Sequence, residues 1–288
     1  MHLFLIFGPA MAATLTVDPS DSTAYENIQD AIDAASDGDT IEVAADTYSE
    51  CIDTSGLDLT ISGNSSDDTI LDGDGDCDNT VSVQSGETVS ITGLTLRNSG
   101  YRALWVYGSA LDTEDVVIEN SGSNTINGGG AYIDGGVVTM VDSSIVENTG
   151  DYGGNLYVTG ASDVALQNVE ISEGEAYYGA GIYLEDDSSS GGSQLRLSQS
   201  SVDDNTSYFS GAGVYIPAES EVDSVESSFT DNYAYYGSGV AVYAAGNYTS
   251  ENDTFAENEV HASSSSSYMG GAVYANAALA GRPVHEWK

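Results

Sequence analysis

The chain has 288 residues, which is enough for one elongated domain or two compact ones. Its 46 acidic residues against five Lys and Arg give a formal net charge of −41, and this charge repels nucleic acid, anionic lipid and polyuronate chains. Such a surface suits neutral glycans, cations, a basic partner or simple solubility in salty surroundings. The 40% of hydrophobic residues can form a core, and the 19 tyrosines are unusual.

The first twelve residues, MHLFLIFGPAMA (1–12), resemble the end of a secretory signal. Leu3 to Phe7 is an apolar run, and Ala10-Met11-Ala12 fits a small-x-small cleavage site. Because no basic segment precedes the run, an ordinary buried strand is the alternative. The signal-like start leads us to expect an extracellular or cell-surface location. No stretch reaches the roughly eighteen apolar residues of a membrane span, so we expect no transmembrane segment.

A strand at 14–17 (TLTV) precedes the one amphipathic helix, which we expect over Thr23 to about Ala35. Thr23 and Glu26 have the spacing of a capping box, Gly38 follows as a C-terminal cap, and strand alternation resumes at 40–43. We expect this helix to cover the open apolar end of the structure that follows it. Its apolar stripe consists of Ile28, Ala31, Ile32 and Ala35.

The two cysteines, Cys51 and Cys77, lie 26 residues apart, which equals one unit of the repeat described next. Residues one repeat apart would be vertical neighbours roughly 4.8 Å apart, within the Cα range of a disulfide. A disulfide would agree with export. Two unpaired, buried thiols are the alternative.

From Gly128 to Tyr274 one pattern returns six times: Gly, two small residues, an apolar residue, Tyr and another apolar residue. The copies begin at 128, 153, 179, 211, 237 and 270, and the period is near 26 once the inserts at 185–193 and 260–267 are removed. This period is short for a propeller blade, and no unit contains a helical pattern. We therefore predict an all-β, single-stranded parallel β-helix over 13–275, with eight or nine coils, followed by an off-pattern tail at 276–288.

Asparagine occupies one turn position in most coils, at Asn98, Asn120, Asn148, Asn205, Asn232 and Asn258. Asn tolerates left-handed backbone, and stacked amides hydrogen-bond along a ladder, so we expect a structural column with Gly174 in one coil. An acidic residue precedes each of the last five Asn and Gly174: Glu119, Glu147, Glu173, Asp204, Asp231 and Glu257. Stacking would bring these carboxylates together, and either a cation such as Ca²⁺ or a splayed, solvated face would relieve their repulsion.

Tyrosine forms a second column, with Ala241 in the gap. Because the flanking apolar residues must face the core, we expect these tyrosines to face outward and to bind a ligand or partner, or to form a self-stacked ladder that only stiffens the sheet. The column comprises Tyr132, Tyr157, Tyr183, Tyr215 and Tyr274. A second aromatic set precedes the Gly corner, at Tyr152, Tyr178, Tyr236 and Tyr268, with Tyr177, Phe209 and Tyr235 nearby.

The loop DGDGDCD places Asp72, Asp74 and Asp76 at the D-x-D-x-D spacing of a calcium site. Val83 stands where an EF-hand has its bidentate Glu, so this loop is not an EF-hand. Ca²⁺ is the one ion that the sequence suggests, and no cofactor is required.

The segment 25–50, with LDLTISG and TILDGDG after it, resembles the opening of right-handed parallel β-helix proteins of the pectin-lyase-like superfamily. The GGAVY, FTDN and FAEN motifs resemble the GGA-I and FxxN repeats of polymorphic outer-membrane-type surface proteins. The resemblance covers about 14–275 and implies a right-handed coil. It is poorly specific for function, because the superfamily includes lyases, hydrolases, esterases, adhesins and phage tailspikes. The surface proteins imply adhesion or display.

Catalysis has little support in the sequence. By resemblance, hydrolases of this superfamily carry a Gly-His-Gly histidine and an Arg-x-Lys, whereas His2, His261 and His285 have no such context. Arg97 and Arg102, one coil above the Asp72 loop, are the only lyase-like grouping.

The sequence therefore predicts a non-catalytic protein for adhesion or display, which binds a glycan or a surface protein through its tyrosines. One alternative is a secreted carbohydrate-active enzyme that acts on a neutral or calcium-bridged polysaccharide. Another is a structural fibre or coat segment, in which the open C-terminal coil stacks end to end on another chain.

Overall fold

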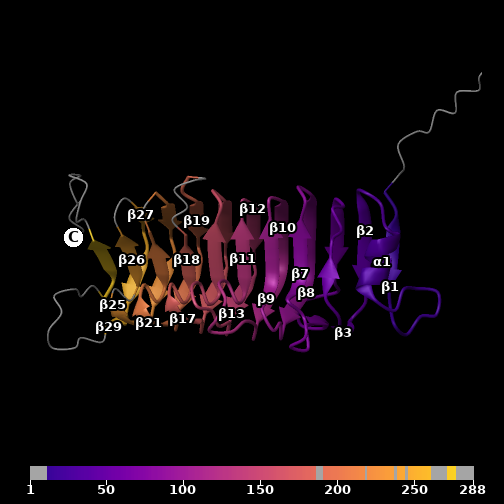
Figure 1. Cartoon of the computed structure of the whole chain (residues 1–288), viewed down its shortest axis with the longest axis horizontal. Coiled ribbons are helices and arrows are strands. Elements are labelled where there is room, and N and C mark those ends of the chain that lie inside the picture. The colour runs from indigo at the N-terminus through magenta and orange to yellow at the C-terminus, as the bar shows by residue number, and fades with distance from the viewer. Residues whose placement is uncertain are drawn as a thin grey trace, which may run out of the picture.

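A computed structural model describes residues 12–185, 191–217, 219–236, 239–243, 246–260 and 271–276. These residues form a parallel β-solenoid of about nine coils, whose strands succeed one another along a single axis (Figure 1). The predicted all-β parallel β-helix is confirmed. The suggested signal segment (1–12) and the off-pattern tail (276–288) lie outside the described residues, except for Ala12 and Asn276.

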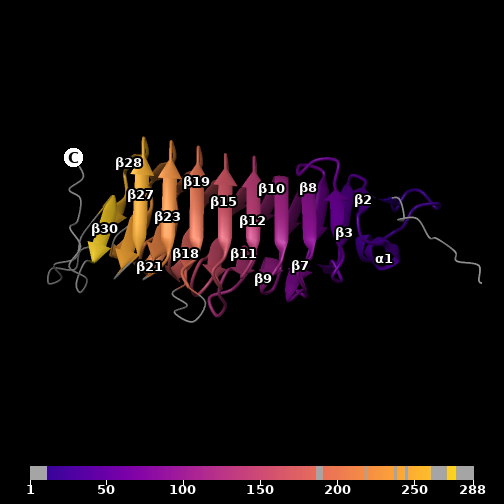
Figure 2. The same cartoon turned by 90° about the horizontal axis from the view of Figure 1, so that it is seen from above.

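Sheet A, the largest sheet, has two arms that meet at a bend (Figure 2). The strands β8 and β10 run through both arms. The first arm contains β1 (Thr14–Val17), β2 (Asp39–Val43), β5 (Leu59–Ser62), β8 (Thr88–Arg97), β10 (Ala110–Glu119), β12 (Val137–Val141), β15 (Asp163–Gln167), β19 (Gln194–Ser198), β23 (Glu221–Val225) and β27 (Asn247–Glu251). The second arm adds β3 (Asp46–Ser49), β6 (Thr69–Asp72), β13 (Ser144–Val146), β16 (Glu170–Ser172), β20 (Ser201–Asp203), β24 (Ser228–Thr230) and β28 (Thr254–Ala256).

Two further parallel sheets complete the solenoid: sheet B runs along its length, whereas sheet C belongs to the later coils only. Sheet B contains β4 (Ile52–Asp53), β7 (Asn79–Gln84), β9 (Arg102–Tyr107), β11 (Ala131–Asp134), β14 (Leu156–Thr159), β18 (Ile182–Leu184), β22 (Val214–Ile216), β26 (Val240–Tyr243) and β30 (Val273–Asn276). Sheet C contains β17 (Glu175–Tyr178), β21 (Thr206–Ser210), β25 (Tyr233–Tyr236) and β29 (Glu259–Val260).

The core is a stack of aliphatic side chains from successive coils. Leu156 pairs with Ile182, and Ile182 pairs with Val214 in the next coil. All three side chains are buried. Because strand side chains alternate between two faces, the residue that follows each of these positions in its strand points away from the core. The predicted register, with residues about one repeat apart as vertical neighbours, is confirmed.

The helix α1 (Ile28–Ala34) lies at the N-terminal end of the solenoid and packs against β1, β2 and β4 (Figure 2). It buries Ile28, Ala31 and Ile32 in the core, as the apolar stripe predicts. That it serves as a cap on the solenoid stays a prediction.

The predicted C-terminal end near Ala35 is confirmed, whereas the predicted start and both predicted caps are wrong. Thr23 does not cap the helix, because its backbone N–H and hydroxyl both donate to Asp21. The helix begins five residues later, where the Glu50 carboxylate accepts the backbone N–H groups of Ile28 and Gln29 at 2.8 and 2.9 Å. At the other end Ala35 is the C-cap residue, and Gly38 (φ 85°) belongs to the turn before β2.

Candidate functional site

Buried asparagines form a hydrogen-bonded ladder along the turn between the second arm of sheet A and sheet C. In every rung but the last, the side-chain Nδ2 donates to the Oδ1 of the Asn in the next coil at 3.0 or 3.1 Å. The rungs are Asn148, Asn155, Asn205, Asn232 and Asn258, and the first four are fully buried. The ladder is structural, because each amide pairs with buried backbone carbonyls as well.

Asn155 fills the rung of the coil in which the predicted column has Gly174. It reaches this position from the turn before β14, and its Nδ2 also donates to the Ser172 carbonyl at 2.8 Å. Gly174 is required there, because a Cβ at that position would lie 2.7 Å from Asn155 Nδ2 and 2.8 Å from Asn205 Oδ1. Sequence reasoning missed Asn155 because it is out of phase with the repeat.

Asn98 and Asn120 do not belong to the ladder, which corrects the prediction for these two residues. They have φ of 55° and 51°, and Asn120 occupies the position taken one coil later by Glu147 (φ 56°). The inward position in their coils is held by Ser99 and Ser121. The residue with left-handed backbone in these turns is thus the one that precedes the inward position. In later coils this residue is acidic: Glu147, Glu173, Asp204, Asp231 and Glu257.

The tyrosine column is a stack of nearly parallel rings on sheet B. Ring centroids lie 5.0 Å apart between Tyr132 and Tyr157, 5.3 Å between Tyr157 and Tyr183, and 5.0 Å between Tyr183 and Tyr215. Trp105 pairs with Tyr132 in the preceding coil, and sequence reasoning missed this position. The backbone of Tyr274 continues the column by pairing with Ala241.

This stack is not the open contact face that alternation predicts. Tyr157 is only 2% exposed, because Tyr132 and Tyr183 cover both faces of its ring. Burial raises the pKa of its hydroxyl, and the neighbouring Glu185 carboxylate raises it further. Since stacking on a sugar requires a free ring face, the inner members of the stack contribute stiffness to sheet B rather than a stacking surface.

Four half-exposed aromatic side chains lie on the neighbouring sheet C. Tyr177 in β17, Tyr208 and Phe209 in β21, and Tyr235 in β25 are between 40% and 46% exposed. A β-bulge places both Tyr208 and Phe209 opposite Tyr177, with ring centroids 5.5 and 5.7 Å away. We call these four residues the aromatic patch; the sequence indicated all of its members except Tyr208.

The aromatic patch is anchored to the stack beneath it. Phe209 stacks on Tyr178 at 5.2 Å, and Tyr178 meets Tyr215 edge to face at 5.4 Å. Such contacts restrict the rings before any ligand arrives, so the ordering cost of binding is low.

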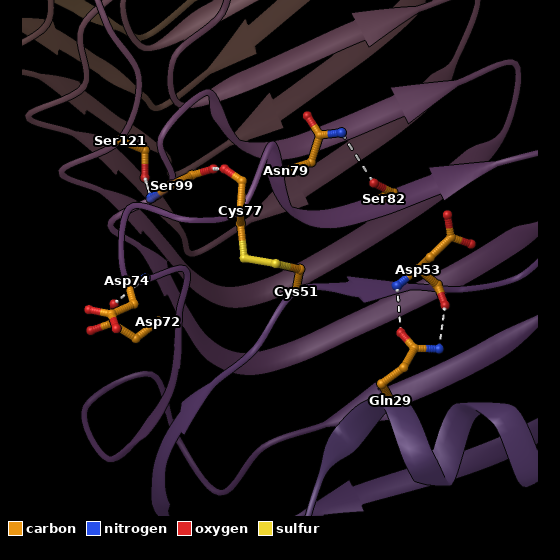
Figure 3. Close-up of a disulfide and its surroundings, with 10 residues drawn as sticks. All are labelled: Gln29, Cys51, Asp53, Asp72, Asp74, Cys77, Asn79, Ser82, Ser99 and Ser121. Carbon is orange, nitrogen blue, oxygen red and sulfur yellow. Dashed lines mark hydrogen bonds between the residues drawn. A yellow bond between two sulfur atoms is a disulfide. The ribbon is translucent and has the colours of Figure 1, made fainter.

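The Asp72 loop lies beside a disulfide between Cys51 and Cys77, whose Cα atoms are 5.7 Å apart (Figure 3). Asp72 accepts hydrogen bonds from Arg97 Nε at 2.8 Å and from Asn98 Nδ2 at 3.0 Å. Burial opposes the ionisation of Asp72, but these bonds and the Asp74 backbone N–H hold its pKa below the usual value.

The three carboxylates of this loop do not form a ligand set. Asp74 and Asp76 are exposed, whereas Asp72 is occupied by Arg97 and Asn98. Among the residues that the structure describes, no three Asp, Glu, His or Cys side chains converge on a point where a metal ion could bind. Calcium binding stays a prediction from the sequence.

All three arginines in the described ranges are already engaged. Arg97 pairs with Asp72, and Arg196 pairs with Asp163. The Arg102 guanidinium lies 4.3 Å from the Tyr132 ring centroid, and its Nε donates to the Asn127 carbonyl at 2.9 Å. Burial lowers the pKa of Arg102. Arg97 and Arg102 therefore serve different local contacts.

A groove of about 600 Å³ follows the bend between the two arms of sheet A. One rim carries a left-handed residue from each of five successive coils, namely Asp142, Asn168, Gln199, Glu226 and Asn252. The other wall carries Ser144, Glu170, Ser201, Ser228 and Thr254, which pair in register from coil to coil. Sequence reasoning missed this groove, because it depends on how sheet A bends.

No helix among the described residues is long and apolar enough to cross a membrane.

Comparison with solved structures finds pectin methylesterases with a similar fold. The enzyme from carrot is 13% identical, with 94% of this chain and 89% of that chain covered and a TM-score of 0.55. The enzyme from Aspergillus niger is 16% identical, with 94% and 92% covered and a TM-score of 0.53. The enzyme PemA from Erwinia chrysanthemi is 13% identical, with 84% and 90% covered and a TM-score of 0.50. At this level of identity the likeness shows the fold alone.

Comparison of the sequence with curated proteins finds no match. The family model described as the right handed beta helix region matches residues 79–255. This segment is more than half of the chain and spans the stacked rings from Tyr132 to Tyr215, the aromatic patch, the groove and every rung of the ladder except Asn258. The protein therefore belongs to the right-handed β-helix family.

Proposed function

We propose that this protein is an exported glycan-binding protein whose contact surface is the aromatic patch. The observation that carries the proposal is the gathering of half-exposed rings on three neighbouring strands of sheet C. A contiguous exposed aromatic surface marks a binding site more often than a scattered one. Aromatic rings that keep a free face are suited to stacking on sugar rings.

The charge of the molecule decides the class of glycan. With a net charge of −41, the protein repels uronates and sulfated chains, so the ligand is a neutral glycan. The Cys51–Cys77 disulfide supports export, because such bonds persist in oxidising compartments. Export and glycan binding together support a role in adhesion or display.

The test is binding to an array of neutral glycans, followed by titration of the best ligand. Tyr177→Ala combined with Phe209→Ala should weaken binding about 30-fold, at roughly 1 kcal/mol for each lost ring contact. The matched control is Tyr101→Ala combined with Tyr107→Ala, because these two rings are somewhat more exposed than Tyr177 and Phe209 but lie outside the patch. Equal affinities for the two double variants would show that the patch is not the contact surface.

Pectin methylesterase activity is the alternative suggested by the solved structures of similar fold. It can be measured as methanol release from methyl-esterified pectin, and hydrolase activity as the release of reducing ends. Catalytic turnover by the wild-type protein in either assay would replace the binding proposal with a carbohydrate-active enzyme.

A further inference from the structure

The groove along the bend of sheet A differs chemically from the aromatic patch, since no aromatic residue lines it. Three carboxylates line it, from Asp142, Glu170 and Glu226. Their nearest polar partners are neutral: the Asn168 amide donates to Asp142 at 2.6 Å, and the Gln199 amide donates to Glu226 at 3.2 Å. The groove thus carries three negative charges without a cation in its lining.

The rest of the described chain offers no cation to neutralise this groove. The three described arginines are held by Asp72, by the Tyr132 ring and by Asp163, and none lines the groove. Asp203 lies two residues after Ser201 and close to Glu170, so it adds a further carboxyl beside the groove. Burial raises the pKa of the Asp203 carboxyl, and the nearby Glu170 raises it further. Within the described ranges no residue supplies the compensating charge, and a basic partner would supply it.

The spacing of the carboxylates favours a linear occupant over a single ion. Asp142, Glu170 and Glu226 belong to the first, second and fourth of five successive coils, so they are spread along the axis at multiples of about 4.8 Å. No three such groups converge within the described ranges, as chelation of a metal ion would require. Three alternate side chains of an extended peptide span about 13 Å, close to the roughly 14 Å along the axis between the coils of Asp142 and Glu226. The flexible stems of Lys and Arg can take up the difference of about 2 Å at Glu170.

The groove walls also suit a peptide backbone. Hydroxyls from Ser144 and Ser228 and the amide of Asn252 line the cavity between the charged positions. These groups donate and accept hydrogen bonds, as the N–H and C=O groups of an extended segment require.

We propose that this groove binds an extended basic segment of a protein partner, with Lys or Arg at alternate positions paired to Asp142, Glu170 and Glu226. The proposal is independent of glycan binding at the aromatic patch, because the two surfaces share no residue. It gives the strongly acidic β-helix a way to hold a basic protein while sheet C holds a glycan.

The test uses a fluorescein-labelled octapeptide, KSKSKSKS, with binding followed by fluorescence anisotropy in 0.15 M salt. Glu170→Gln combined with Glu226→Gln should weaken binding about tenfold, because two charge-assisted contacts are lost. Glu42→Gln combined with Glu114→Gln removes the same net charge from exposed positions outside the groove and should change affinity less than about twofold. The isomer KKKKSSSS should bind the wild-type protein more weakly than KSKSKSKS.

Equal losses in the two double variants would show general attraction to an acidic surface, and this would overturn the proposal. No preference between the two peptides would overturn it as well. Binding of a neutral hexasaccharide to both variants separates the two surfaces. If the groove variant fails to bind it while the Tyr177→Ala and Phe209→Ala variant still does, the groove is a glycan site instead. That last result would also separate failure of this proposal from failure of the patch.

Discussion

At the scale of single residues, the turns of this solenoid divide two tasks between neighbouring positions. The outer position takes left-handed backbone and is acidic in the later coils, as at Glu147 and Asp204. The inner position holds an amide that satisfies buried backbone groups, as at Asn148 and Asn205. A substitution at the inner position should therefore cost far more stability than one at the outer position.

Asn155→Ala tests this division. It removes the acceptor of the Asn148 amide and the donor to Asn205, which leaves buried polar groups unpaired. We expect the free energy of unfolding to fall by about 2–4 kcal/mol, measured by chemical denaturation. Asn120→Gly keeps the left-handed turn at an exposed position and should change it by less than about 0.5 kcal/mol. Similar losses of unfolding free energy in both variants would show that the inner position does not contribute more to stability than the outer one.

Glu87 provides a pH-dependent test at the same scale. Its side chain is buried, its Oε1 accepts bonds from Thr54 and from the Gln84 N–H, and its Oε2 has no partner among the described residues. Burial raises the pKa of this carboxyl, and the two hydrogen bonds oppose the rise only in part.

Because the folded pKa is raised, protonated Glu87 adds stability that is complete below its unfolded pKa of about 4.3 and is lost as pH rises through the folded value. Glu87→Gln cannot ionise, so its stability relative to wild type should increase from pH 4 to pH 7. Denaturation at the two pH values measures this difference. A constant difference would show that Glu87 does not titrate between them.

At the scale of elements, neighbouring coils near the N-terminal end are joined to each other by contacts that run along the axis of the solenoid. The disulfide joins the segments before β4 and β7, one coil apart. The Glu50 carboxylate, between β3 and β4, holds the first turn of α1. The first coils are thus tied together by covalent and charge-assisted bonds in addition to core packing.

Replacement of both cysteines by alanine should lower the free energy of unfolding by about 3 kcal/mol, because the unfolded chain regains the freedom of a loop of about one coil. Denaturation of the wild-type protein with and without a reducing agent is the control. The reduced wild type should match the variant. An unchanged denaturation midpoint in both the variant and the reduced wild type would mean that core packing alone sets the stability of these coils.

At the scale of the whole molecule, stacking of the coils places acidic residues that recur once per repeat in one line along the axis. One acidic residue per coil stands at the left-handed turn position, from Glu147 to Glu257, and the described arginines are engaged elsewhere. Neighbouring carboxylates in such a line repel each other unless counter-ions screen them. The folded state therefore carries an electrostatic cost that depends on salt.

Dilution of NaCl from 1 M to 10 mM extends the screening length from about 3 Å to about 30 Å. We expect the midpoint of thermal unfolding to fall by about 10 °C or more across this range. KCl at equal ionic strength should act equally, because the effect is screening rather than site binding. A midpoint that is independent of salt would show that the carboxylates splay apart enough to avoid one another.

Periodicity determined the fold of this protein, because in a solenoid each coil contacts only its neighbours and one local pattern repeats. The apolar positions Leu156 and Ile182, the Cys51–Cys77 spacing and the stacking of Tyr157 on Tyr183 all follow from a period near 26. Features that break the period were decided only by tertiary structure. They include Asn155 in the rung opposite Gly174, Glu50 at the start of α1, and the bulge that turns both Tyr208 and Phe209 outward.

The candidate surfaces divide in the same way. Alternation indicates which aromatic rings point away from the core, but only the packed stack shows that Tyr157 is enclosed and that Tyr177 is not. The groove at Glu170 and Glu226 exists because sheet A bends. The spacing of residues in the sequence does not show on which side of the bend a cavity forms. Sequence period specifies which residues become neighbours along the axis, whereas the packing around each coil decides which of them a ligand can reach.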